Sequence, residues 1–123
     1  MENATTTTRY NADERKAIAL TILSQFAGGR QPGAFTMMVG AKDLISLDGG
    51  IQFSLKPCGD FNKSGINRVT VILTPADEYT VTFSRVYGGK ETIIATHEHA
   101  YCDDLSDLFF KATNLMPYMG YRF

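Results

Sequence analysis

Residues 67–83 have the sequence NRVTVILTPADEYTVTF. Apolar and polar side chains alternate on both sides of a central Pro75-Ala76-Asp77-Glu78 segment, and β-branched residues are frequent. A period of two is typical of a half-buried β-strand, and a short segment that contains proline is typical of a turn. The stretch therefore predicts two antiparallel strands, at 67–74 and 79–87, with one apolar face and one polar face.

Three further segments, at 35–39, 51–56 and 91–98, are also rich in β-branched or aromatic residues and are expected to be strands. The glycine-bearing connections at 48–50 and 88–89 are as short as those of antiparallel hairpins. The segment 57–66 is longer than a tight hairpin requires and is expected to be a loop inserted between two strands. The pattern indicates a five-stranded, mostly antiparallel sheet.

A helix is expected on each side of these strands. Asn11 can cap an N-terminal helix that ends at Gly28-Gly29, and Cys102 or Asp103 can cap a C-terminal helix. Apolar residues recur every three or four positions in both, at Ile18, Ile22, Leu23 and Phe26, and at Leu105, Leu108, Phe109, Ala112 and Leu115. An antiparallel sheet can leave one face in water, so we expect an α+β fold with both helices packed on one face.

The alternation also assigns side chains to the two faces of the sheet. The residues expected to face the helices are Phe53, Leu55, Val69, Val71, Leu73, Val81, Phe83, Ile93 and Ala95. The residues expected to face away from them are Gln52, Ser54, Lys56, Arg68, Thr70, Thr74, Thr80, Thr82, Ser84 and Thr96. The second face is therefore expected to be rich in hydroxyl groups.

The length and the charge of the chain restrict its class. A chain of 123 residues and 13.6 kDa is expected to form a single α+β domain at 11–123, preceded by a flexible, threonine-rich segment at 1–10. Twelve Lys and Arg against thirteen Asp and Glu give a net charge of −1, which argues against a strongly basic nucleic-acid binder and against an acidic DNA mimic. No signal peptide and no membrane-spanning segment is recognised, so we expect a cytoplasmic protein.

Metal-capable side chains are densest at His97-Glu98-His99, which Cys102 follows closely. A regular strand would place both histidines on one face. A structural zinc site needs four ligands, usually in paired short spacings, and only one such pair occurs here. We therefore expect His97, His99 and Cys102 to bind no metal.

No pattern in the chain indicates catalysis. Cys102 with His99 could form a nucleophile and its base, but the spacing shows no third group to hold the base and no oxyanion donors. The glycine pairs belong to no GxGxxG or GxxxxGK[ST] sequence, so no phosphate cradle is predicted. We expect a protein that is not an enzyme and needs no cofactor.

The expected binding surface combines the loop at 57–66 with the polar face of the sheet. Rows of Thr and Ser leave a flat surface at which a partner can meet hydroxyl and backbone groups, and this suits a protein better than a metabolite. Phe61 at the middle of the loop is the expected anchor. The predicted partner-binding residues are Phe61, Lys63, Arg68, Thr70 and Thr82.

The C-terminal segment 115–123 is rich in methionine and aromatic residues. Such side chains either fold back on the core or meet a partner, since exposed apolar patches of this kind are uncommon on monomers. A partner could be a second copy of the chain, which would give a homodimer.

Several segments together resemble a known family. These are Gly40-Ala41-Lys42, IQFSL at 51–55, the hairpin at 67–83, YCDDL at 101–105, Leu108-Phe109 and TNL at 113–115. They are similar to a family of small orphan proteins carried by bacteriophages, prophages and plasmids, for which no activity is established. The resemblance implies an accessory protein of a mobile element that acts in the bacterial cytoplasm. The longer loop at 57–66 and the aromatic tail depart from the family pattern.

Three functions follow as hypotheses. The first is a non-enzymatic inhibitor that binds and blocks a host defence component, such as a CRISPR system or another anti-phage system. A nucleic-acid-binding accessory protein is favoured instead if Lys56, Arg68 and nearby lysines cluster. A sponge for a small ligand such as a signal nucleotide is favoured if the fold encloses a pocket with convergent polar groups.

Overall fold

The sheet and helices follow one another in a simple order along the chain. The computed structural model describes residues 10–55 and 65–117. Its helices are α1 (Ala12–Phe26), α2 (Pro32–Val39), the short 3-10 helix η2 (Cys102–Asp104) and α3 (Leu105–Thr113). Its strands are β1 (Lys42–Leu47), β2 (Gly50–Ser54), β3 (Arg68–Leu73), β4 (Tyr79–Tyr87) and β5 (Lys90–Ala100).

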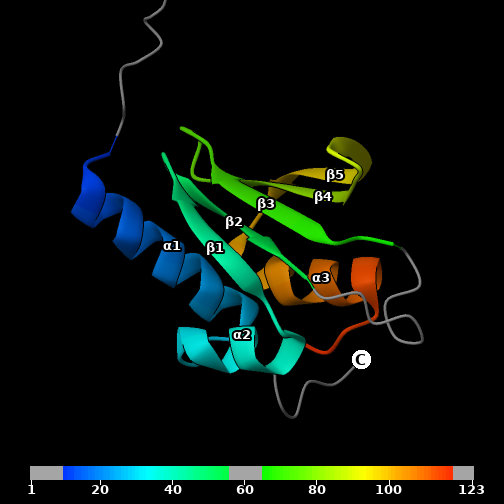
Figure 1. Cartoon of the computed structure of the whole chain (residues 1–123). Coiled ribbons are helices and arrows are strands. Elements are labelled where there is room, and N and C mark those ends of the chain that lie inside the picture. Colours follow the sequence, from blue (N-terminus) through cyan, green and yellow to red (C-terminus); the bar gives the residue numbers. More distant parts are fainter. Residues whose placement is uncertain (1–9, 56–64, 118–123) are drawn as a thin grey trace, which may run out of the picture.

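The five strands form one sheet in the order β1-β2-β3-β4-β5, and every neighbouring pair is antiparallel. This meander confirms the predicted α+β class and the five-stranded antiparallel sheet. In Figure 1 α1 lies to the lower left of the sheet and α2 and α3 lie below it, while the opposite side of the sheet faces upward. No helix in the described part of the chain covers that side, which is called the outer face below.

The core lies between the helices and one row of side chains on each inner strand. Phe53, Val69, Val71, Val81 and Phe83 are fully buried, as the alternation predicts. They form one cluster with the apolar side chains of the helices, which include Ile22, Phe26, Phe35, Leu105 and Phe109. The rings of Phe26, Phe35, Phe53 and Phe109 contact one another in stacked or edge-on geometry.

The first and last helical segments begin at or next to the residues predicted to cap them. The side chain of Asn11 accepts a hydrogen bond from the backbone of Glu14 at 2.8 Å, and the Glu14 side chain accepts from the backbone of Asn11 at 2.9 Å. This reciprocal capping box confirms the start of α1. At the C-terminal helix, the backbone of Tyr101 donates to Asp104 at 3.0 Å, so the capping pair begins one residue earlier than predicted.

The strand predicted at 35–39 is wrong. This segment belongs to α2, because Pro32 lies at the first helical positions, where its fixed φ favours a helix, and Gly40 ends the helix with φ 68°. Phe35 and Val39 are four residues apart and share the buried side of α2. The first strand is instead β1, all of whose residues are exposed or half-buried.

The prediction that Ile93 faces the helices is also wrong. Phe83 pairs with Ala95, but Ser84 pairs with Ile93, so one extra residue of β5 forms a bulge. The bulge moves Ile93 to the outer face, where it is 62% exposed. Ala95 packs against the core as predicted.

Two terminal segments and one loop fall largely outside this description. Residues 1–9, 56–64 and 118–123 are not described, so the predicted flexible segment, the loop residues and the end of the tail are not placed. Tyr10 is described, and its backbone N–H donates to Asp48 at 3.0 Å. Leu115 packs against the core, and Pro117 is buried.

Candidate functional site

The central row of the outer face crosses all five strands without a charged residue. It is called the Thr70 row, and its members pair in register from β1 to β5 as Ile45, Gln52, Thr70, Thr82 and Thr96. At the usual strand spacing of about 4.8 Å, the row is about 19 Å long. The Thr70 hydroxyl contacts Oε1 of Gln52 at 3.4 Å.

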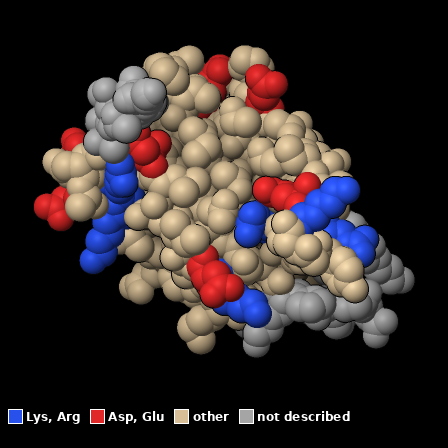
Figure 2. Space-filling model, turned by 45° about the horizontal axis from the view of Figure 1, so that its top comes forward, with Lys and Arg blue, Asp and Glu red and all other residues tan. Residues whose placement is uncertain are grey.

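Aliphatic side chains are exposed at both ends of this face. Ile45 on β1 is 49% exposed and Ile93 on β5 is 62% exposed. Ile72 is half-buried next to the Thr70 row. Figure 2, in which the top of Figure 1 comes forward, shows a broad uncharged area with basic and acidic residues side by side around it.

A second row carries the charges and is called the Arg68 row. Its members pair across the strands as Lys42, Ser54, Arg68, Ser84 and Ile93. Atom Nη1 of Arg68 lies 3.5 Å from Oε1 of Glu91, and the buried Ser84 hydroxyl donates to Oε2 of the same carboxylate at 2.6 Å. The Glu91 carboxylate therefore connects Arg68 to the β4–β5 hairpin.

Asn67 fixes the chain where it enters β3. Its side-chain amide donates to the carbonyl of Val86 at 2.9 Å and accepts from the backbone N–H of Val86 at 2.8 Å. These two bonds hold the beginning of β3 against β4, and Arg68 follows directly in the chain. These bonds therefore fix the backbone from which the Arg68 side chain extends.

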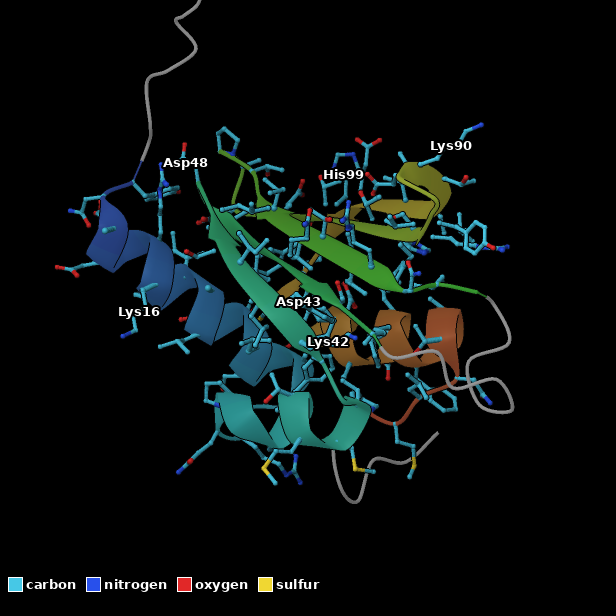
Figure 3. All side chains as sticks on the ribbon, viewed as in Figure 1. Lys16, Lys42, Asp43, Asp48, Lys90 and His99 are labelled. Carbon is cyan, nitrogen blue, oxygen red and sulfur yellow. The ribbon has the colours of Figure 1, made fainter. Side chains whose placement is uncertain are left out.

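A cavity of about 280 Å³ lies beside Arg68 and is called the Arg68 cavity. Among the described residues, its polar lining comes from Lys42, Asp43, Ser54, Asn67 and Arg68. Figure 3 shows Lys42 and Asp43 next to one another at the end of β1 that follows α2. Asp43 has a φ of 55° and lies where the pairing of β1 with β2 shifts register.

The predicted site residues fall into two groups. Arg68, Thr70 and Thr82 lie together on the outer face, with Thr70 paired directly to Thr82. Phe61 and Lys63 lie outside the described residues. Lys42 and Ile45 are not among the predicted residues, because the strand β1 shows no alternation in the sequence. Glu91 is not among them because its contact with Arg68 depends on the register of β5.

His97 and His99 have different surroundings, although a regular strand would place both side chains on one face. The pairing of β4 with β5 shifts between Val81 and Tyr79, and His99 has a φ of 62°. The ring of His97 meets Phe83 edge-on at 5.9 Å. Among the described residues, no group of three or more His, Cys, Asp or Glu side chains could hold a metal ion.

His99 instead belongs to a surface cluster around Glu78. Its Nδ1 lies 2.8 Å from Oε1 of Glu78, while the Tyr101 hydroxyl donates to Oε2 at 3.0 Å. The hydrogen bond with His99 lowers the pKa of Glu78, and the same bond raises the pKa of His99. The bond to Glu78 also raises the pKa of Tyr101. The cluster connects the β3–β4 turn to the end of β5.

Comparisons with known proteins give no match to a family model, a curated protein or a solved structure. No helix in the described part of the chain has the length and apolar character to span a membrane. A function therefore has to be inferred from the outer face itself.

Proposed function

We propose that the chain is a non-enzymatic binding protein that covers a surface of another protein, and that the outer face of its sheet is the docking surface. The observation that carries this proposal is the Thr70 row, which crosses the whole sheet without a charge and has an exposed isoleucine, Ile45, at its β1 end. The chemistry of this row matches a protein partner with uncharged polar and aliphatic side chains.

Protein interfaces commonly have an apolar or neutral centre and a polar rim. The outer face has this arrangement, since the Thr70 row is neutral and Lys42, Arg68 and Glu91 lie to one side of it. Threonine hydroxyl groups can donate and accept hydrogen bonds, and their methyl groups add apolar contact area. Short side chains on paired strands also lose little conformational entropy when a partner binds.

The charge pattern favours a protein over a nucleic acid as the partner. A track for single-stranded nucleic acid requires a basic groove with aromatic side chains on which bases stack. Among the described residues of the outer face, Lys42 and Arg68 are the cations of the paired rows, and Asp43 and Glu91 lie near them.

The cellular role that we propose is that of an accessory protein of a phage or another mobile element. In this role the chain binds and blocks a host defence component in the bacterial cytoplasm. The support for this setting is the resemblance of the hairpin at 67–83 and the flanking motifs to small orphan proteins of mobile elements. A protein that blocks its target needs a docking surface and no reactive centre, which fits the outer face.

Site-specific photo-crosslinking in bacterial cells tests this proposal. A photoreactive amino acid replaces Thr82 in one variant and Lys16 in a matched control, because Lys16 is exposed on α1. We expect one discrete protein to be crosslinked from position 82 and not from position 16. Crosslinks from position 16 alone, or to nucleic acid from position 82, would contradict the proposal.

A further inference from the structure

The Arg68 cavity has hydrogen-bonding capacity that the described residues leave unused. A guanidinium group carries five N–H donors. The contact between Nη1 of Arg68 and Glu91 is 3.5 Å long, and Nε is buried without a hydrogen-bond partner. The Glu91 carboxylate has a much shorter bond, 2.6 Å, from the Ser84 hydroxyl. Glu91 therefore uses little of the donor capacity of Arg68.

A second cation lies across the same cavity. Lys42 pairs with Ser54, and Ser54 pairs with Arg68, so both cations belong to one row with a hydroxyl group between them. Two strand spacings separate their backbones by about 10 Å. Long side chains can converge on one small ligand over this distance. Lys42 forms no ion pair with any residue in the described ranges 10–55 and 65–117.

The local charge selects a carboxylate over a phosphate. The planar fork of a guanidinium group matches a carboxylate in a bidentate arrangement. Asp43 lines the cavity and Glu91 borders Arg68, so among the described residues two acids balance the two cations. Without a net positive charge from these residues, the second charge of a phosphate dianion has no counterion there, whereas the guanidinium fork suffices for the single charge of a carboxylate. A volume of about 280 Å³ accommodates a side chain of the size of glutamate.

From these contacts we infer that the Arg68 cavity receives an aspartate or glutamate side chain of the partner protein while the neutral Thr70 row covers the adjoining surface. This inference rests on the proposed function and adds the chemistry by which the partner is recognised. The neutral row supplies contact area, and the cavity fixes the orientation of the partner by one charged, directional contact.

A titration with small probes tests the cavity without the partner. The probes are a glutamate residue blocked at both ends, the corresponding glutamine compound and inorganic phosphate. The signals to follow by NMR are the Nε–H group of Arg68 and the backbone amides of Ser54 and Asn67. We expect saturable shifts with glutamate at millimolar concentrations, and at least fivefold weaker binding with glutamine.

Two variants distinguish the contribution of the planar guanidinium geometry of Arg68 from the contribution of its charge. Arg68→Gln should abolish saturable binding of glutamate, while Arg68→Lys, which keeps the charge and loses the fork, should weaken it about fivefold. A well-dispersed spectrum of each variant shows that it is folded. Equal binding of glutamate by the wild type and Arg68→Gln would overturn the inference, and so would tighter binding of phosphate than of glutamate.

The outcomes for the cavity and for the docking surface are distinguishable. Glutamate binding at Arg68 without any protein crosslinked from position 82 would support the cavity as a carboxylate site and contradict the proposed function. A protein crosslinked from position 82 without glutamate binding would support the docking surface and overturn the inference on the cavity.

Discussion

Phe35 and Met37, two residues apart on α2, distinguish the helix in the structure from the strand that the sequence suggests. Phe35 is fully buried, and its ring stacks on Phe26 at 4.8 Å and meets Phe109 edge-on at 5.0 Å. Met37, two residues later, is 86% exposed. In a strand these two side chains would point to the same face, whereas in a helix they point in different directions.

Truncation to alanine should therefore destabilise the protein strongly at Phe35 and hardly at all at Met37. Removing a buried phenylalanine ring costs about 3–5 kcal/mol, because apolar contacts are lost and a cavity remains. At about 4 °C per kcal/mol for a domain of this size, Phe35→Ala should lower Tm by about 12–20 °C. Met37→Ala should change the free energy of unfolding by less than about 0.5 kcal/mol.

Urea unfolding followed by circular dichroism, together with thermal melts, measures both values. The wild type and both variants must show similar m-values, so that a change in midpoint reports stability. If Met37→Ala destabilises the protein as much as Phe35→Ala does, α2 does not pack as described and the account of the core is wrong.

Three further predictions concern the sheet and its edges. An NMR titration should give His99 a pKa above its ordinary 6.5, and Glu78→Gln should bring that pKa back toward 6.5. Because the pKa of His99 is raised in the folded state, the stabilisation by the His99–Glu78 contact is complete below the unfolded pKa of 6.5 and is lost as the pH rises through the folded pKa. The Tm difference between the wild type and Glu78→Gln should therefore shrink as the pH rises above 6.5 and through the folded pKa. Val71→Asp should cost about 4 kcal/mol or more because it buries an unpaired carboxylate, while Thr82→Asp should cost less than about 1 kcal/mol; equal losses in thermal melts would show that the two faces are assigned wrongly. In Gly50→Ala the new Cβ would collide with the backbone carbonyl of Val71, so urea unfolding should show a loss of more than about 2 kcal/mol, and a wild-type midpoint would contradict the close approach of β2 and β3.

Features that depend on local sequence could be predicted. The cap at Asn11 could be predicted because it depends on residues next to one another in the chain, and the structure adds the return bond from the backbone of Asn11 to the Glu14 side chain. The facing of Val69, Val71 and Val81 follows from alternation, because the register between β3 and β4 has no bulge.

The segment from α2 to β1 could not be assigned from side-chain preference alone. Phe35 and Val39 favour strands in general, but Pro32 and Gly40 act on the backbone and define a helix between them. β1 offers no apolar alternation because none of its residues is buried. Pro32 and Gly40 are therefore the sequence signals of α2, whereas β1 depends on pairing with β2.

Some contacts of the candidate site could not be predicted, because they depend on how the strands pair in register. Arg68, Thr70 and Thr82 were placed on one face because strand parity determines it. The contact of Arg68 with Glu91 and the outward position of Ile93 depend on a bulge in β5, which alternation does not show. Lys42 joins the Arg68 cavity only because β1 pairs with β2, so its role could not be seen before that strand was known.

The most direct test of the outer face as a docking surface is a binding isotherm with the protein that is crosslinked from position 82. Calorimetry compares the wild type, Thr82→Arg on the outer face and Lys16→Glu on α1. We expect Thr82→Arg to weaken binding at least about 100-fold, because a bulky charge would lie in the neutral centre of the interface, while Lys16→Glu should bind like the wild type. Unchanged affinity in Thr82→Arg, or an equal loss in Lys16→Glu, would contradict the assignment of the outer face.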